Sequence, residues 1–112
     1  MAKYIYVGNY SNEGAAGLIG GTDNRATAIR VVCESAGAKF LSFEITRGQY
    51  DFCLNFEAKS FDIVGAIILK VKATGAIEDG VLLETVNINK IRKVSQEVQY
   101  KAPKAKKSFA WG

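Results

Sequence analysis

The chain has 112 residues, of which 48% are hydrophobic and 11% aromatic, and its net charge is +4. This length and composition fit one globular domain and exclude a chain that is disordered throughout. Histidine is absent, which excludes histidine-ligated metal or haem iron and any serine or cysteine nucleophile activated by histidine.

The N-terminal third predicts a strand, a glycine-rich connection and a helix. Residues 3–10 are rich in aromatic and β-branched types, which indicates a strand. Segment 11–22 contains four glycines. Glycine costs about 1 kcal/mol relative to alanine inside a helix, so we expect at most a short, mobile helical piece. Apolar residues at helical spacing then predict a helix with Asp23 as N-cap and Gly37 as C-cap.

Residues 39–58 predict a β-hairpin with a defined register. Apolar and polar residues alternate on both sides of Gly48-Gln49, a two-residue loop that fits a type II′ turn. One face then carries the pairs Arg47–Tyr50, Ile45–Phe52, Phe43–Leu54 and Leu41–Phe56. The other face carries the pairs Thr46–Asp51, Glu44–Cys53, Ser42–Asn55 and Phe40–Glu57. A slip of one residue would mix the two faces, so the register is strongly specified.

The C-terminal half predicts a helix, a strand, a second helix and a tail. The first helix has Ser60 as N-cap and ends at Thr74-Gly75. Its apolar stripe comprises Phe61, Val64, Ile67, Ile68 and Val71. After a turn at Asp79-Gly80, residues 81–88 predict the fourth strand. A last short helix then follows from the spacing of Ile91, Val94 and Val98.

The order of elements predicts an α+β fold, a ferredoxin-like βαββαβ sandwich with an extra C-terminal helix and tail. We expect a domain over residues 1–100 and a basic tail over 101–112, with Phe109 and Trp111 as apolar anchors that act between subunits. Lysine and arginine are concentrated after residue 90: residues 1–89 hold eight of them against ten acidic residues. The basic charge is therefore a property of the tail, and we expect no nucleic-acid partner.

The hairpin also resembles the GYD family of small proteins, which is named for a Gly-x-Tyr-Asp element. Gly48, Tyr50 and Asp51 match that element, and the resemblance covers roughly residues 3–90. It implies membership of the dimeric α+β barrel group, in which two ferredoxin-like sheets pack face to face. It therefore implies a homodimer or a higher even oligomer.

Two readings of each sheet face remain open. Large aromatics face the small residues of the first helix, which either pack solidly or leave a slot for an apolar ligand. The candidate ligand-binding residues are Phe43, Arg47, Tyr50, Phe52, Leu54, Phe56 and Ile67. Arg47 or Tyr50 would hold the polar end of the ligand, and the glycine-rich segment would act as a gate. The opposite, polar face is either solvated or the interior of the dimer barrel.

No catalytic residue can be named from the sequence. Tyr50 and Asp51 point to opposite faces of a strand and cannot easily share one site. The glycines of segment 14–21 lack the Gly-x-Gly spacing of a dinucleotide-binding loop. We expect no cofactor, no metal and, with Cys33 and Cys53 on opposite sides of the sheet, no disulfide.

The leading hypothesis is a small-molecule binding protein that holds an acyl chain or a polyketide-like ring. The alternatives are a cofactor-independent monooxygenase or isomerase, suggested by analogy between related barrels, and a structural oligomer without ligand. No apolar run approaches the roughly 20 residues of a membrane span, and residues 1–4 lack a signal-peptide core. We therefore expect a cytoplasmic protein that does not associate with membranes.

Overall fold

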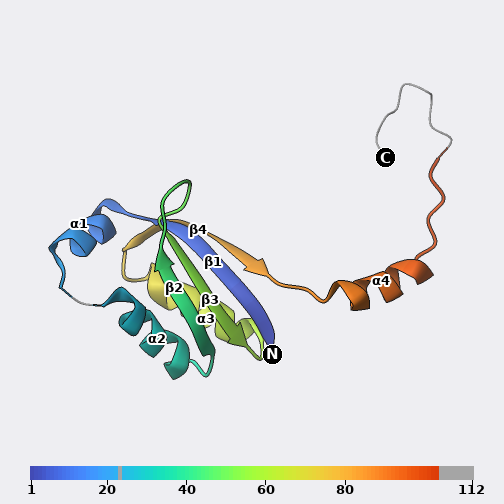
Figure 1. Cartoon of the computed structure of the whole chain (residues 1–112), viewed down its shortest axis with the longest axis horizontal. Helices are drawn as coiled ribbons and strands as arrows, with labels where there is room; N and C mark the ends of the chain where they lie inside the picture. The colour runs from blue at the N-terminus through green and yellow to red at the C-terminus, as the bar shows by residue number, and fades with distance from the viewer. Residues whose placement is uncertain (23, 104–112) are drawn as a thin grey trace.

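The computed structural model describes residues 1–22 and 24–103. Its centre is a four-stranded antiparallel sheet in the order β2-β3-β1-β4 (Figure 1). The strands are β1 (Ala2–Tyr10), β2 (Lys39–Ile45), β3 (Phe52–Ala58) and β4 (Ile77–Glu84). The helices are α1 (Asn12–Gly20), α2 (Arg25–Ser35), α3 (Phe61–Lys72) and α4 (Ile88–Glu97). This arrangement is the predicted ferredoxin-like α+β fold.

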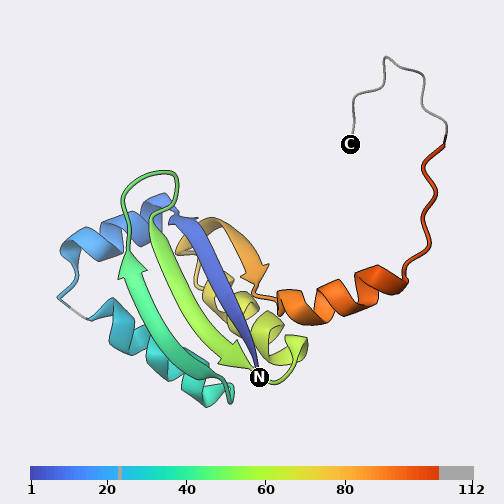
Figure 2. The ribbon, with the colours of Figure 1, turned by 45° about the vertical axis from the view of Figure 1, so that its right-hand side comes forward.

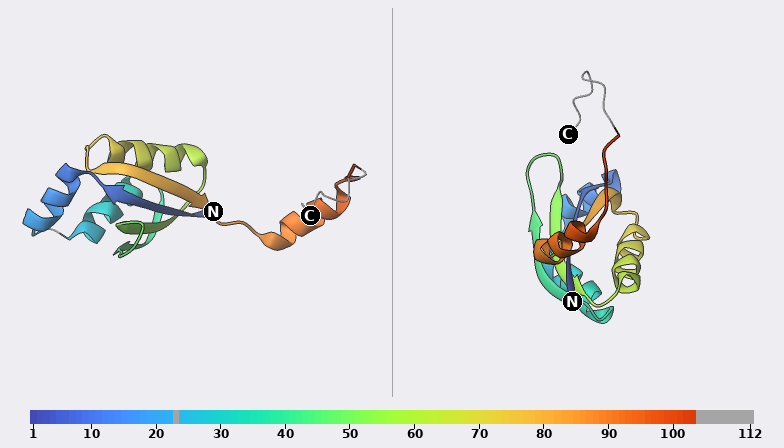
Figure 3. Two further views of the ribbon diagram at one scale, coloured as in Figure 1. Left: turned by 90° about the horizontal axis from the view of Figure 1, so that it is seen from above. Right: turned by 90° about the vertical axis from the view of Figure 1, so that its right-hand side faces the viewer.

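The core lies between one face of the sheet and the helices α2 and α3. Because side chains alternate along a strand, Tyr4 and Tyr6 of β1 face the helices together with the even-numbered residues of β3. Cys33 of α2 and Val64 of α3 are fully buried against them. The other face of the sheet has no cover from the described part of the chain (Figure 3).

The predicted hairpin register is correct from Ser42–Asn55 to Ile45–Phe52. It is wrong at the start of β2, before Ser42. A β-bulge at Leu41 shifts the ladder, so that Phe40 pairs with Phe56 instead of Glu57. A bulge adds one unpaired residue and reverses the faces that follow it. Phe40 therefore lies on the helix side, where the guanidinium of Arg30 sits 4.7 Å from its ring centre.

The hairpin loop is also longer than the sequence indicates. The ladder ends at Ile45–Phe52, so residues 46–51 form the loop in place of the two-residue turn. Gly48 has a φ of +130°, a backbone conformation that favours glycine. The amide of Thr46 donates to the Asp51 carbonyl at 2.8 Å and closes this loop.

Local capping explains the helix boundaries before β2. The glycine-rich segment forms α1, which begins where the hydroxyl of Ser11 accepts from the Gly14 amide at 3.1 Å. The N-cap of α2 is Asn24, whose side chain accepts from the Thr27 amide, and the predicted cap Asp23 lies outside the described residues. Gly37 ends the helix at a φ of +85°, as predicted.

Two expectations for the C-terminal half are wrong. Phe61 is 62% exposed, because the buried stripe of α3 is centred on Val64 and Ile67 and Phe61 lies at its edge. The fourth strand spans Ile77–Glu84 instead of 81–88, so the expected turn at Asp79-Gly80 lies inside it. Gly80 pairs with Gly8, and the ring of Tyr6 occupies the space that a side chain at position 80 would need.

The last helix leaves the body of the protein. Figures 1 and 2 show α4 extending away from the sheet, and none of its residues is buried. Residues 101–103 follow as exposed coil. The predicted anchors Phe109 and Trp111 lie outside the described residues. Within the described ranges, no helix is long and apolar enough to cross a membrane.

Candidate functional site

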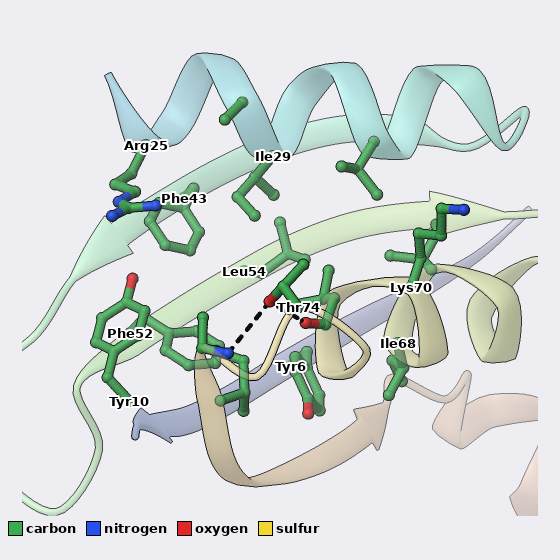
Figure 4. A pocket seen from close by; sticks show the side chains of 16 residues that line it. Tyr6, Tyr10, Arg25, Ile29, Phe43, Phe52, Leu54, Ile68, Lys70 and Thr74 are labelled. Atoms are coloured by element: carbon green, nitrogen blue, oxygen red, sulfur yellow. Dashed lines mark hydrogen bonds between the residues drawn. The ribbon is translucent and has the colours of Figure 1, made fainter. Parts of the chain in front are cut away.

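A cavity of about 270 Å³ lies between the sheet and part of α2 and α3 (Figure 4). Its volume is just below the roughly 300–1,000 Å³ of typical small-molecule sites. Its walls are mainly apolar and come from both helices, from all four strands and from the turn after α3. The apolar lining comprises Ala28, Ile29, Val32, Phe43, Phe52, Leu54, Ile67, Ile68, Val71, Ala76 and Ile77.

Phe52 is the centre of an aromatic cluster at one side of the cavity. Its ring centre lies 5.3 Å from that of Tyr10, 5.8 Å from Tyr6 and 5.9 Å from Phe43. Aromatic pairs at such separations stabilise one another beyond their burial alone. The four rings come from β1, β2 and β3, so the cluster joins three strands and fixes the shape of this wall.

Arg25 lies at the end of the cavity that borders an outer depression. Together with Phe43 it lines both the inner cavity and a shallow outer depression that also borders Thr22 and Ile45. Figure 4 shows its guanidinium directed to the same end as the side chain of Tyr10. Lys70 contributes to the opposite end of the lining.

The polar groups of the lining are mostly neutral at physiological pH. Burial raises the pKa of Tyr6 and that of Tyr10, and for Tyr10 this outweighs the opposing effect of Arg25. Both phenols therefore stay protonated. The hydroxyl of Thr74 donates to the Val71 carbonyl at 2.7 Å and accepts from the Ala76 amide at 3.2 Å. The fixed charges of the lining are the two cations, Arg25 and Lys70.

The structure brings four of the seven candidate ligand-binding residues to this cavity. They are Phe43, Phe52, Leu54 and Ile67. Phe56 is fully buried in the core behind it. Arg47 and Tyr50 lie in the hairpin loop and do not line the cavity. A cation of this lining is Arg25, to which the sequence assigned no binding role and which it placed only in the first helix.

Asp51 of the Gly-x-Tyr-Asp element ties the hairpin to β1. Its carboxylate accepts from the Tyr10 amide at 3.0 Å, and its own amide donates to the Gly8 carbonyl at 2.8 Å. The hydroxyl of Thr46 donates to the carbonyl of Tyr50 on the other side of the loop. The element therefore anchors the wall that carries Phe52, and this accounts for its aspartate without catalysis.

Replacing Asp51 with alanine is expected to lower the free energy of unfolding by about 1–3 kcal/mol, because the Tyr10 amide loses its acceptor. Asp51→Asn keeps an oxygen acceptor at the same place and should retain most of that stability. Urea unfolding of the two variants measures the difference. Equal midpoints for Asp51→Ala and the unchanged protein would contradict the anchoring role.

The GYD domain family model matches residues 4–94. The chain belongs to the GYD domain family. The match includes the hairpin, the cavity walls and most of α4, so the cavity described above lies within a GYD domain. No curated protein sequence is significantly similar to the chain.

Solved structures with the same fold are distant in sequence. The protein FFRP-DM1 is 9% identical with a TM-score of 0.55, covering 77% of this GYD chain and all of its own. A transcriptional regulator of Neisseria meningitidis, solved with L-Met, is 9% identical with a TM-score of 0.56. The protein MtbAldR is 10% identical with a TM-score of 0.53. Each of these two alignments covers 77% of the GYD chain. They cover only 50% of the Neisseria meningitidis regulator and 52% of MtbAldR.

The titratable groups in the described part of this GYD domain give little support to a metal site or a reactive cysteine. Its described residues contain no group of three or more Cys, Asp or Glu that could hold a metal ion. Burial raises the pKa of the Cys33 thiol to about 11, so this thiol is protonated at neutral pH. Cys53 lies half-buried on the open face of the sheet, opposite Cys33, and both cysteines are free.

Proposed function

We propose that this GYD protein binds a small apolar or amphipathic molecule between its sheet and its helices. The observation that carries the proposal is the apolar cavity of about 270 Å³ with Arg25 at one end, beside an outer depression. Burying each CH₂ of a ligand there is worth about 0.8 kcal/mol. The volume favours a medium-length chain or a single ring system over a larger ligand.

The charge of Arg25 at one end of the cavity favours a ligand with an anionic or strongly polar end. A guanidinium binds a carboxylate in a planar, two-pronged geometry. The L-Met bound to the regulator of similar fold carries a carboxylate too. We therefore favour a carboxylate such as a medium-chain fatty acid, with its chain along Phe52 and Ile67 and its head at Arg25.

Arg25→Ala should weaken decanoate binding roughly 10- to 100-fold, because a hydrogen bond to a charged group contributes about 1.5–3 kcal/mol. Decanol has the same chain without the charge, and its affinity should change little. Arg47→Ala is the matched control, since Arg47 lies outside the cavity lining. Isothermal titration of the three proteins measures these affinities. A loss of decanoate affinity in Arg47→Ala alone would instead place the head group at the hairpin.

Native mass spectrometry of the purified protein tests the proposal without assuming a ligand. A retained small apolar molecule supports binding. A protein that carries nothing and shows no heat with medium-chain fatty acids contradicts it, and the structural-oligomer alternative then takes its place. Turnover of a retained molecule with oxygen would favour the monooxygenase alternative.

We further propose that the protein forms a homodimer or a higher even oligomer. On the open face of the sheet, Ile5 pairs with Leu83 and Val7 with Val81, which gives a contiguous apolar patch. Apolar side chains grouped in this way are typical of surfaces that another chain covers. Sedimentation at micromolar concentration is expected to show the oligomer, and a monomer would contradict this proposal.

A further inference from the structure

Two apolar surfaces remain exposed in the described part of the chain. One lies on the open face of the sheet and the other on α4. The apolar stripe comprises Ile91 and Val94 of α4 and Val98 directly after it, which are 45%, 64% and 63% exposed. The patch on the sheet comprises Ile5, Val7, Val81 and Leu83, of which Val81 is 40% and Leu83 50% exposed. An amphipathic helix normally buries such a stripe.

The two surfaces match in size. From Ile91 to the end of α4 at Glu97 the helix rises about 9 Å, at about 1.5 Å per residue. The sheet patch extends about 7 Å along the strands and about 5 Å across one strand pair. Polar side chains fill the neighbouring positions on β2 and β3, among them Ser42, Glu44 and Asn55. The patch therefore fits one helix better than a second whole sheet.

The link between β4 and α4 directs the helix away from its own sheet (Figure 1). Both the amide and the hydroxyl of Thr85 donate to the Lys3 carbonyl, at 2.9 and 3.1 Å, which extends β4 along β1. The side chain of Asn87 caps α4 by accepting from the amides of Asn89 and Lys90. Only Val86 stands between these two hydrogen-bonded residues, and beyond it the chain continues away from the sheet (Figure 1).

We propose that α4 is an exchanged arm. It lies on the open sheet face of a second copy, and the α4 of that copy lies on the open sheet face of the first. Charge favours this pairing, because residues 1–89 are net acidic and residues 90–112 hold seven basic residues against one acidic residue. One ten-residue helix is about 15 Å long, and alone it covers less than the roughly 1,200 Å² of a stable interface. Reciprocal exchange doubles the buried area.

The first test changes the stripe of α4 and leaves its outer face intact. Ile91→Asp with Val94→Asp should raise the dissociation constant of the dimer roughly a hundredfold, since buried unpaired carboxylates are strongly unfavourable. The matched control, Asn89→Asp with Gln96→Asp, adds the same charge on the opposite side of the helix and should leave the dimer intact. Sedimentation measures self-association, and circular dichroism verifies that each variant is folded.

The outcomes separate the arm from self-association itself. A monomeric unchanged protein contradicts both the oligomer and the arm. An oligomer that survives Ile91→Asp with Val94→Asp overturns only the arm and favours direct packing of the two sheets. Loss of the oligomer in both double variants also overturns the arm, because the effect would then follow from charge alone.

A crosslink tests which sheet the helix covers. In a Cys53→Ser background, a Val94→Cys chain mixed with a Val81→Cys chain should form a disulfide-linked dimer under mild oxidation. The chain that carries both substitutions should give the same linked dimer at low concentration. A linked monomer in that chain would place α4 on its own sheet and overturn the exchange. No crosslink in either case would overturn it as well.

Discussion

Phe52→Ala is expected to be the most damaging single substitution in this protein. It should lower the free energy of unfolding by about 3–5 kcal/mol, the usual range for removing a buried phenylalanine. Phe52 is 3% exposed and its ring contacts three other rings, so the change removes packing from three strands at once. It also joins the space left by the ring to the cavity.

Chemical unfolding with Phe61→Ala as control tests this expectation. Phe61 is the same residue type but lies on the outer side of α3, 62% exposed, so its loss should cost little. Ligand titration should show weaker decanoate binding for Phe52→Ala, because the wall that guides the chain is gone. Similar stability for the two alanine variants would mean that the aromatic cluster contributes little to the fold.

Gly14→Ala is expected to destabilise the protein by about 1–3 kcal/mol, the typical effect of inserting a methyl group into a filled site. A Cβ at Gly14 would overlap the carbonyl oxygen of Ala76, and a backbone atom cannot rotate away. The substitution would push the first turn of α1 from the start of β4. It would also strain the bond from the Ser11 amide to that same carbonyl.

Gly20→Ala is the matched control in the same helix. Apart from its chain neighbours and the backbone of its own helix, no atom lies within 4 Å of the position that its Cβ would take. Alanine is about 1 kcal/mol better than glycine inside a helix, so this variant should be neutral or slightly more stable. Thermal unfolding of the pair separates the contact from the helix propensity. A more stable Gly14→Ala would show that α1 can move freely away from Ala76.

The sequence predicted the fold because local signals agreed with one another along most of the chain. The alternation in β3 places Phe52, Leu54 and Phe56 on the buried face, and the capping glycines at 37 and 75 end their helices at positive φ. What failed depended on contacts between distant segments. The bulge at Leu41 leaves no mark in the alternation. In the sequence, Gly80 is typical of a turn. In the structure it lies within β4, because the Tyr6 ring leaves no room for a side chain at position 80.

Several residues that line the cavity could be selected from the sequence, whereas Arg25 could not. A strand pattern tells which residues face the helices, so Phe43, Phe52 and Leu54 could be selected from the sequence alone. Which cation reaches the end of the cavity depends on how α2 lies over the sheet, and this is a tertiary relation. The spacing of residues in the sequence does not show that Arg25, and not Arg47, lines the cavity. The solved structures of similar fold share only 9–10% identity and add no residue-level guidance.

The position of β1 has a consequence for how the chain folds during synthesis. β1 is made before the other three strands of the sheet, yet it pairs with β3 and with β4, which begins at Ile77. The β2–β3 hairpin needs only neighbouring residues, whereas the β1–β4 ladder closes a long loop, and such distant pairings form slowly. Until β4 leaves the ribosome, β1 has one bare edge that can add a strand from another nascent chain.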